Sequence, residues 1–296
     1  MKLELSVAPE VELGKQILPT LKATNAYGSV YALNLKDVAF SFKNGKVVQT
    51  AAGDLKANEL GDEEMTAAFG GLRAVAQLKI TDTIAPVTTA VASPNLGNGW
   101  SNTDVSVQLN ATDDGSGVDN TQYRINDGEW QTYAGTIVIS TDGENVIEYR
   151  STDKAGNTEK PKNLVVKLDK TAPVVKLIPD KKELWPANHK MVTVTIGTSG
   201  TVDPLSGIQS IILKSITSNE AENGTGDGNT SQDIQNANFG TSDFTFDLRA
   251  ERSGNGKGRV YTITYIVTDK AGNKTTAATT VTVPQTEGSE KPPLSM

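Results

Sequence analysis

The sequence predicts an all-β fold of three tandem β-sandwich domains. Apolar and polar residues alternate over short segments, which is the period of a half-buried strand, and Gly, Pro and Asn residues that favour turns separate these segments. Blocks of sequence also recur along the chain, which indicates repeated domains. No long segment keeps the period of an amphipathic helix.

The expected strands occur in every third of the chain. They include alternating or β-branched segments at 38–42, 74–80, 105–111, 192–196 and 280–283. Asp127-Gly128 stands between apolar flanks, as in a tight hairpin. Short strands with regular turn signals predict sandwiches of about seven strands each.

Three blocks recur in the same order in the middle and C-terminal thirds, one with Ala-Pro-Val, one with Ser-Gly and one ending in Asp-Lys-Ala-Gly-Asn. The pairs are 82–87 with 169–174, 113–118 with 203–208, and 147–157 with 263–273. The last pair agrees at eight of eleven positions. In its turn we expect Gly to take a positive φ angle and Asn to bond its own backbone.

The repeats predict domains at 1–83, 84–172 and 173–285, with a linker-like tail at 286–296. The third domain contains a long polar insert, 219–243. We expect the chain to be part of a longer protein.

Composition excludes several classes of function. The chain has no cysteine and a single histidine, so thiolate metal sites, disulfides and multi-histidine zinc sites are excluded. Its formal net charge of -7, with scattered basic residues, argues against nucleic-acid binding. No apolar run is long enough for a membrane span, so we expect no membrane insertion.

The polar insert contains the best candidate metal site. Glu220, Asp227, Asn229 and Asp233 offer closely spaced oxygens on a Gly-rich loop, the ligand type that calcium prefers. The spacing departs from an EF-hand, because Gln232 replaces the required glycine. Two interpretations remain open: a calcium loop and a solvated acidic loop.

Other aspartates form two weaker candidates for calcium. One is an acidic cluster at a sandwich end, and the other is a calcium-bridged joint between domains. The residues are Asp113, Asp114, Asp119 and Asp153 for the cluster, and Asp82 and Asp169 for the joints. We favour the turn-forming role that Asp often has for the cluster, and read the joint aspartates as too few to bind an ion.

Four aromatic residues near turns are candidates for stacking on a sugar ring: Trp100, Trp130, Tyr133 and Trp185. Tryptophan at the rim of a sandwich also serves as partly buried packing. We favour packing and keep glycan binding as the alternative.

Several of these segments resemble known domains. Gly99-Trp100, Ser116-Gly117-Val118, residues 123–130 and residues 148–153 together are similar to a bacterial immunoglobulin-like (Ig-like) repeat that accompanies secreted polysaccharide-degrading enzymes and surface proteins. The third domain resembles a C-terminal Ig-like domain of similar exoproteins, and the first resembles the invasin-type fold more weakly.

The resemblance implies an extracellular, secreted or surface-attached chain without catalytic activity. We expect a monomeric accessory region of a polysaccharide-degrading enzyme, acting as a spacer with weak binding to polysaccharide or cell-wall glycan and with calcium as a stabilising ion. The alternative is an adhesin or cell-surface stalk that binds a protein or cell-wall partner. A catalytic domain hidden in the insert is disfavoured, since no catalytic motif is present.

Overall fold

The computed structural model describes residues 1–95, 99–224, 228 and 230–287. The described chain is almost entirely β, and the predicted fold class, all-β with tandem Ig-like sandwiches, is confirmed. One compact unit comprises 1–92, 107–137 and 146–165, and a second comprises 93–106, 138–145 and the chain from Val166 onward. The residue boundaries of the individual domains stay a prediction.

The N-terminal part of the first unit contains ten strands, which form three sheets, and one short 3-10 helix. The sheet orders are β1-β4-β5, β2-β10-β9-β6 and β3-β8-β7. The elements are β1 Lys2–Ser6, β2 Glu10–Glu12, β3 Gln16–Ile17, β4 Thr20–Thr24, β5 Val30–Ala32, η1 Leu35–Asp37, β6 Ala39–Phe42, β7 Val47–Gln49, β8 Leu55–Ala57, β9 Gly61–Phe69 and β10 Leu72–Thr81.

The middle of the chain forms two sheets, with orders β11-β13-β16 and β12-β18-β17-β14-β15. The strands are β11 Val87–Ser93, β12 Trp100–Ser101, β13 Val105–Thr112, β14 Val118–Ile125, β15 Gln131–Thr132, β16 Ile137–Ile139, β17 Gly143–Asp153 and β18 Lys162–Leu168. Every second residue of β17 from Asn145 to Asp153 is buried, as the alternating pattern predicts for a strand with one face on a core.

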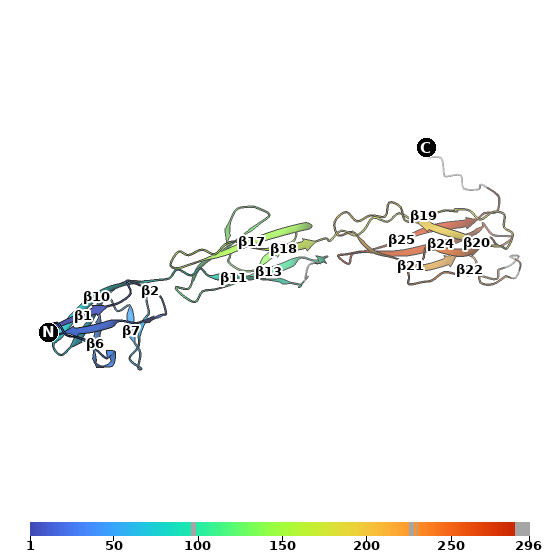
Figure 1. Cartoon of the computed structure of the whole chain (residues 1–296). Coiled ribbons are helices and arrows are strands. Elements are labelled where there is room, and N and C mark those ends of the chain that lie inside the picture. Colours follow the sequence, from blue (N-terminus) through green and yellow to red (C-terminus); the bar gives the residue numbers. More distant parts are fainter. Residues whose placement is uncertain (96–98, 225–227, 229, 288–296) are drawn as a thin grey trace. The chain divides into compact units, whose positions relative to one another are not determined.

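The C-terminal part also forms two sheets, with orders β19-β20-β23-β22 and β21-β24-β25. The strands are β19 Ile178–Pro179, β20 Met191–Gly197, β21 Ile208–Ser218, β22 Ile234–Gln235, β23 Thr245–Arg249, β24 Arg259–Asp269 and β25 Lys274–Val283. The antiparallel pair β24 and β25, orange to red in Figure 1, lies beside β21.

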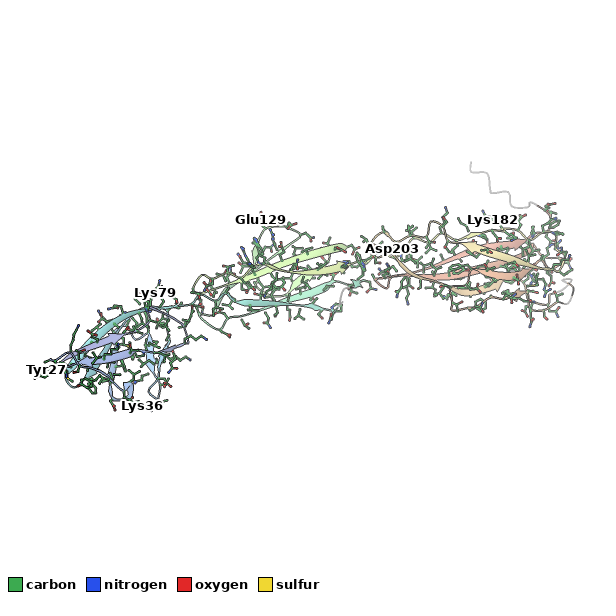
Figure 2. The ribbon with its side chains drawn as sticks, in the orientation of Figure 1. Tyr27, Lys36, Lys79, Glu129, Lys182 and Asp203 are labelled. Carbon is green, nitrogen blue, oxygen red and sulfur yellow. The ribbon has the colours of Figure 1, made fainter. Side chains whose placement is uncertain are left out.

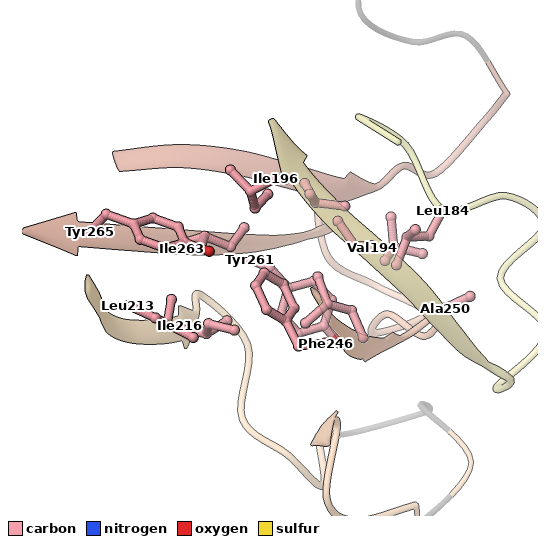
Figure 3. Close-up of a cluster of buried hydrophobic side chains, with 13 residues drawn as sticks. Leu184, Val194, Ile196, Leu213, Ile216, Phe246, Ala250, Tyr261, Ile263 and Tyr265 are labelled. Atoms are coloured by element: carbon pink, nitrogen blue, oxygen red, sulfur yellow. The ribbon is translucent and has the colours of Figure 1, made fainter. Parts of the chain in front are cut away.

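The core of the second unit lies between these last two sheets. Side chains from both sheets pack against one another, and β24 contributes the largest of them, Tyr261 and Tyr265 (Figure 3). Burial of such apolar area is the main force that holds a sandwich together. The Tyr265 hydroxyl donates a hydrogen bond to the carbonyl oxygen of Asp243 at 2.8 Å.

Candidate cation sites formed by the recurring aspartates

The structure brings the three recurring blocks together at one place in each unit. In the first unit, carboxylate oxygens of Asp82, Asp113 and Asp153 lie within 4.8 Å of one another. In the second unit, the equivalent residues of the repeat do the same; they are Asp169, Asp203 and Asp269. We call these clusters the first and the second triad.

Three different elements supply the members of the first triad. Asp82 directly follows β10, Asp113 directly follows β13, and Asp153 ends β17. Asp153 and Asp82 are almost completely buried, with exposed fractions of 2% and 7%. All three aspartates therefore lie where a strand ends and the chain enters a loop.

The second triad has the same construction. Asp169 directly follows β18, Asp203 lies in the loop between β20 and β21, and Asp269 ends β24; Asp203 is labelled in Figure 2. Asp169 and Asp269 have no exposed surface. Asp203 is the equivalent of Asp113, and both are partly buried.

The Asp-Lys-Ala-Gly-Asn turn ties its triad together through the asparagine amide. In the first unit, Asn157 Nδ2 donates to Asp153 Oδ2 at 2.7 Å and to the Asp82 carbonyl oxygen at 2.8 Å. In the second unit, Asn273 Nδ2 makes the same two bonds, to Asp269 and Asp169, at 2.8 Å each. Gly156 and Gly272 have φ angles of 96° and 97°, so the predicted role of glycine in this turn is confirmed. The asparagine amide differs from the prediction, because it binds a segment distant in sequence rather than the backbone of its own turn.

Backbone N–H groups bind one side of the remaining carboxylates. Asp113 Oδ2 accepts from the N–H groups of Gly115 and Gly117, and Asp82 Oδ2 accepts from Ser116 at 2.7 Å. A Cβ atom at Gly115 would lie 2.5 Å from an Asp82 carboxylate oxygen. The loop therefore needs glycine there to let the Asp82 carboxylate approach.

Asp82 is held in its charged form. Burial raises the pKa of its carboxyl group, but hydrogen bonds from Ser116 and from the Ile84 backbone together lower that pKa by a larger amount. The net pKa therefore lies below its ordinary value. The first triad thus contains at least one ionised carboxylate in a poorly solvated place.

The two described carboxylates of the predicted insert site contact arginine. Asp233 is 2% exposed, accepts from Arg249 Nε at 3.1 Å and also accepts from Arg259 Nη1. Glu220 lies 3.5 Å from Arg259 Nε. Asp227 and Asn229 lie outside the described residues. Calcium on the insert stays a prediction.

Arg259 lies at the centre of this cluster of carboxylates, which differs from the triads in containing arginine. Its side chain is completely buried, and the equally buried Glu251 lies 3.7 Å from its Nη2. Burial lowers the pKa of Arg259, but its hydrogen bonds and charge interactions with Asp233 and Tyr261 together outweigh burial and raise the pKa above the ordinary value. Burial also raises the pKa of the adjacent Tyr261 to about 12.

The sequence contains a signal for Arg259 that the sequence analysis missed. Arg259 has the same parity along β24 as the core residues Tyr261, Ile263 and Tyr265. Because side chains alternate between the faces of a strand, that parity places an arginine on the core side, where it needs acidic partners.

The candidate aromatic residues make other contacts. In the first unit, the guanidinium groups of Arg124 and Arg150 lie 5.0 and 4.2 Å from the Trp130 ring centroid, and the Tyr133 hydroxyl accepts from the Leu109 N–H at 3.1 Å. In the second unit, Lys167 Nζ lies 5.9 Å from the Trp100 ring centroid. The fourth, Trp185, is 41% exposed. Glycan binding by these residues stays a prediction.

A cavity of about 450 Å³ lies in the N-terminal part, lined by Gln16–Pro19, Leu33–Lys36, Phe40 and Ala52–Leu55. Asp54 is the one carboxylate among its lining residues, and it accepts from Gln16 Nε2 at 2.9 Å. Hydrolysis by paired carboxylates needs two acids. This cavity therefore lacks the groups for that chemistry.

Comparison with known families gives a match over part of the chain. Residues 181–285 match the family model of a bacterial Ig-like domain. Comparison with curated proteins gives no match. Among the described residues, no helix is long and apolar enough to span a membrane.

Several solved structures are similar to most of the chain at low identity. Invasin, a bacterial integrin-binding protein, is 15% identical with a TM-score of 0.44, over 96% of this chain and 60% of that one. A bacterial ice-binding adhesin is 14% identical with a TM-score of 0.38, over 95% and 96%. Titin domains A168–A170 are 12% identical with a TM-score of 0.39, over 94% and 98%. Similarities this low say nothing about a shared function.

Proposed function

We propose that this chain is a section of an extracellular stalk on a bacterial surface protein, built of non-catalytic Ig-like domains at 1–83, 84–172 and 173–285. The stalk would hold another part of the polypeptide away from the cell. The match of residues 181–285 to a bacterial Ig-like family supports this class of domain. The chain would act as a monomer, and its net charge of -7 disfavours nucleic acid as a partner.

The observation that carries the proposal is the repeated binding of one asparagine amide to the segment that precedes each repeat. Asn157 holds the carbonyl oxygen of Asp82, and Asn273 holds those of Asp169 and Thr171. Pro86 and Pro173 restrict the backbone of the same segments further. A chain that spaces other parts needs connections with little freedom, and these bonds remove freedom from both segments.

The recurring polar residues have roles in turns, which supports a role without catalysis. The carboxylates of Asp113 and Asp203 accept backbone N–H groups of their own loops. Those of Asp153 and Asp269 accept from the asparagine of the following turn. Groups bound in this way position loops rather than substrates.

A second candidate function is the accessory region of a secreted polysaccharide-degrading enzyme. The observation that favours it is Trp185, which is 41% exposed beside Pro186. An exposed indole ring offers an apolar face to a sugar ring.

Immunolabelling of the source bacterium distinguishes the two functions. An antibody raised against this chain should label intact cells, and protease treatment of those cells should remove the label. Recovery of the parent polypeptide from the culture medium, with an activity that degrades polysaccharide, would overturn the stalk and favour the enzyme accessory. Retardation in glycan affinity gels that Trp185→Ala abolishes would support the same alternative.

A further inference from the structure

The two triads concentrate negative charge that the described residues do not balance. Four of the six aspartates are at most 7% exposed: Asp82, Asp153, Asp169 and Asp269. Among the described residues, no Lys, Arg or His nitrogen lies within 4.0 Å of any of the six carboxylates. Lys170, which follows Asp169, pairs instead with Asp104 at 2.9 Å. Buried charges in proteins are ordinarily paired or bound to a metal.

A buried carboxylate oxygen to which no described residue donates occupies the same position in both triads. Asp113 Oδ2 accepts two backbone N–H groups, whereas its Oδ1 is buried and accepts no hydrogen bond from the described residues. In the second triad, Asp203 Oδ1 accepts from Leu205 and Gly207, while its Oδ2 is buried and accepts nothing from the part of the chain that the structure describes. A buried acceptor without a donor is costly. Its recurrence at equivalent residues indicates that something outside the chain binds there.

The chemistry of the ligand follows from the donor atoms. Each triad offers only oxygen, which selects a hard cation over zinc or copper. Calcium binds oxygen at about 2.3–2.6 Å, so ligands on opposite sides of the ion lie roughly 5 Å apart. In each triad, one carboxylate oxygen from each of the three aspartates lies within 4.8 Å of the other two. Magnesium demands shorter bonds and a near-ideal octahedron.

We propose that each triad binds one calcium ion, giving two sites per chain. The first ion would contact Asp82, Asp113 and Asp153, and the second Asp169, Asp203 and Asp269. Each ion would join the segment that precedes a repeat to two loops of that repeat. The sites rest on the geometry of the triads and would exist whether the chain serves a surface stalk or a secreted enzyme.

The test is calcium titration of the whole chain by isothermal calorimetry after treatment with chelator. We expect the number of bound ions to fall by one in Asp113→Asn, by one in Asp203→Asn and by two in the double variant. Asp114→Asn is the matched control, because Asp114 is exposed beside Asp113 and lies outside the triad. A separate ion on the 219–243 insert would leave these differences unchanged.

Thermal unfolding supplies a second readout that does not depend on calorimetric heat. Calcium should raise the Tm of the wild-type chain and of Asp114→Asn, and the shift should disappear in the double variant. Magnesium at the same concentration should give a smaller shift. Circular dichroism identifies variants that fail to fold, and for those the wild-type Tm with and without chelator decides.

Three results would overturn the proposal. One is a wild-type chain that binds no calcium at millimolar concentration and has the same Tm with and without chelator. Another is binding that neither asparagine substitution reduces, which would place the ions elsewhere. The third is a rise in Tm for Asp113→Asn that is independent of calcium, which would show a shared proton in place of the ion.

Discussion

The second unit contains two acidic clusters that differ in what balances their charge. Around Arg259, the carboxylates of Asp233 and Glu251 are almost completely buried, and arginine side chains face them. In the second triad, Asp169 and Asp269 are equally buried, yet no Lys, Arg or His side chain among the described residues pairs with them. The fold therefore supplies its own positive charge at the Arg259 cluster, whereas the second triad is the place where we propose an external ion.

The difference has a physical consequence for stability. A cluster that contains its own arginines is complete as soon as the chain folds, and its stability depends on keeping every partner. A cluster that binds an external ion is stabilised in proportion to the free concentration of that ion. Four measurements test this difference, in order of decreasing expected effect.

Arg259→Leu should destabilise the chain most. The substitution removes the positive charge and leaves Asp233 and Glu251 buried without it, and breaking a buried ion pair costs about 3–5 kcal/mol. The measurement is the free energy of unfolding in urea. Arg73→Leu, at an exposed position, is the control and should change that free energy little. A loss below 1 kcal/mol for Arg259→Leu would mean that water replaces the arginine.

Asn273→Ala should have an intermediate effect. The variant loses the amide that binds Asp269 and the carbonyl oxygens of Asp169 and Thr171, and unsatisfied buried acceptors cost roughly 1–3 kcal/mol. Thermal and urea unfolding measure the loss, with the exposed Asn163→Ala as control. Equal stability of the two variants would contradict the role given to this amide.

Tyr261 should make the free energy of unfolding fall as the pH rises above 10. Its ordinary pKa of 10.0 is raised to about 12 by burial in the folded chain. Between these values the unfolded chain binds fewer protons than the folded one, so the free energy of unfolding falls as pH rises from 10 to 12, by up to about 1.4 kcal/mol per pH unit. Tyr261→Phe should make this slope shallower, which urea unfolding across that range would show.

Glu220→Gln should have the smallest effect on calcium. Glu220 accepts from the Ser253 N–H at 2.7 Å and contacts Arg259, so its charge already has a partner. Calorimetric titration should give the same number of bound calcium ions as the wild-type chain. One ion fewer in this variant would place a calcium on the polar insert.

Much of the fold follows from the sequence because strand patterns are local. The alternation at 105–111 and 192–196 predicts which side of β13 and β20 is buried, and the structure confirms it. The Asp-Lys-Ala-Gly-Asn turns are predictable for the same reason, since a positive φ angle at Gly156 and Gly272 depends on residues next to them.

The triads and the Arg259 cluster depend on tertiary structure. The sequence identifies Asp82, Asp113 and Asp153 as members of recurring blocks, but their convergence needs three strands to end at one place. The pairing of Arg259 with Asp233 likewise joins β24 to a distant insert. Local patterns determine strands and turns, because their causes lie within a few residues. Only packing decides which buried charges meet, because electrostatic partners are neighbours in space rather than along the chain.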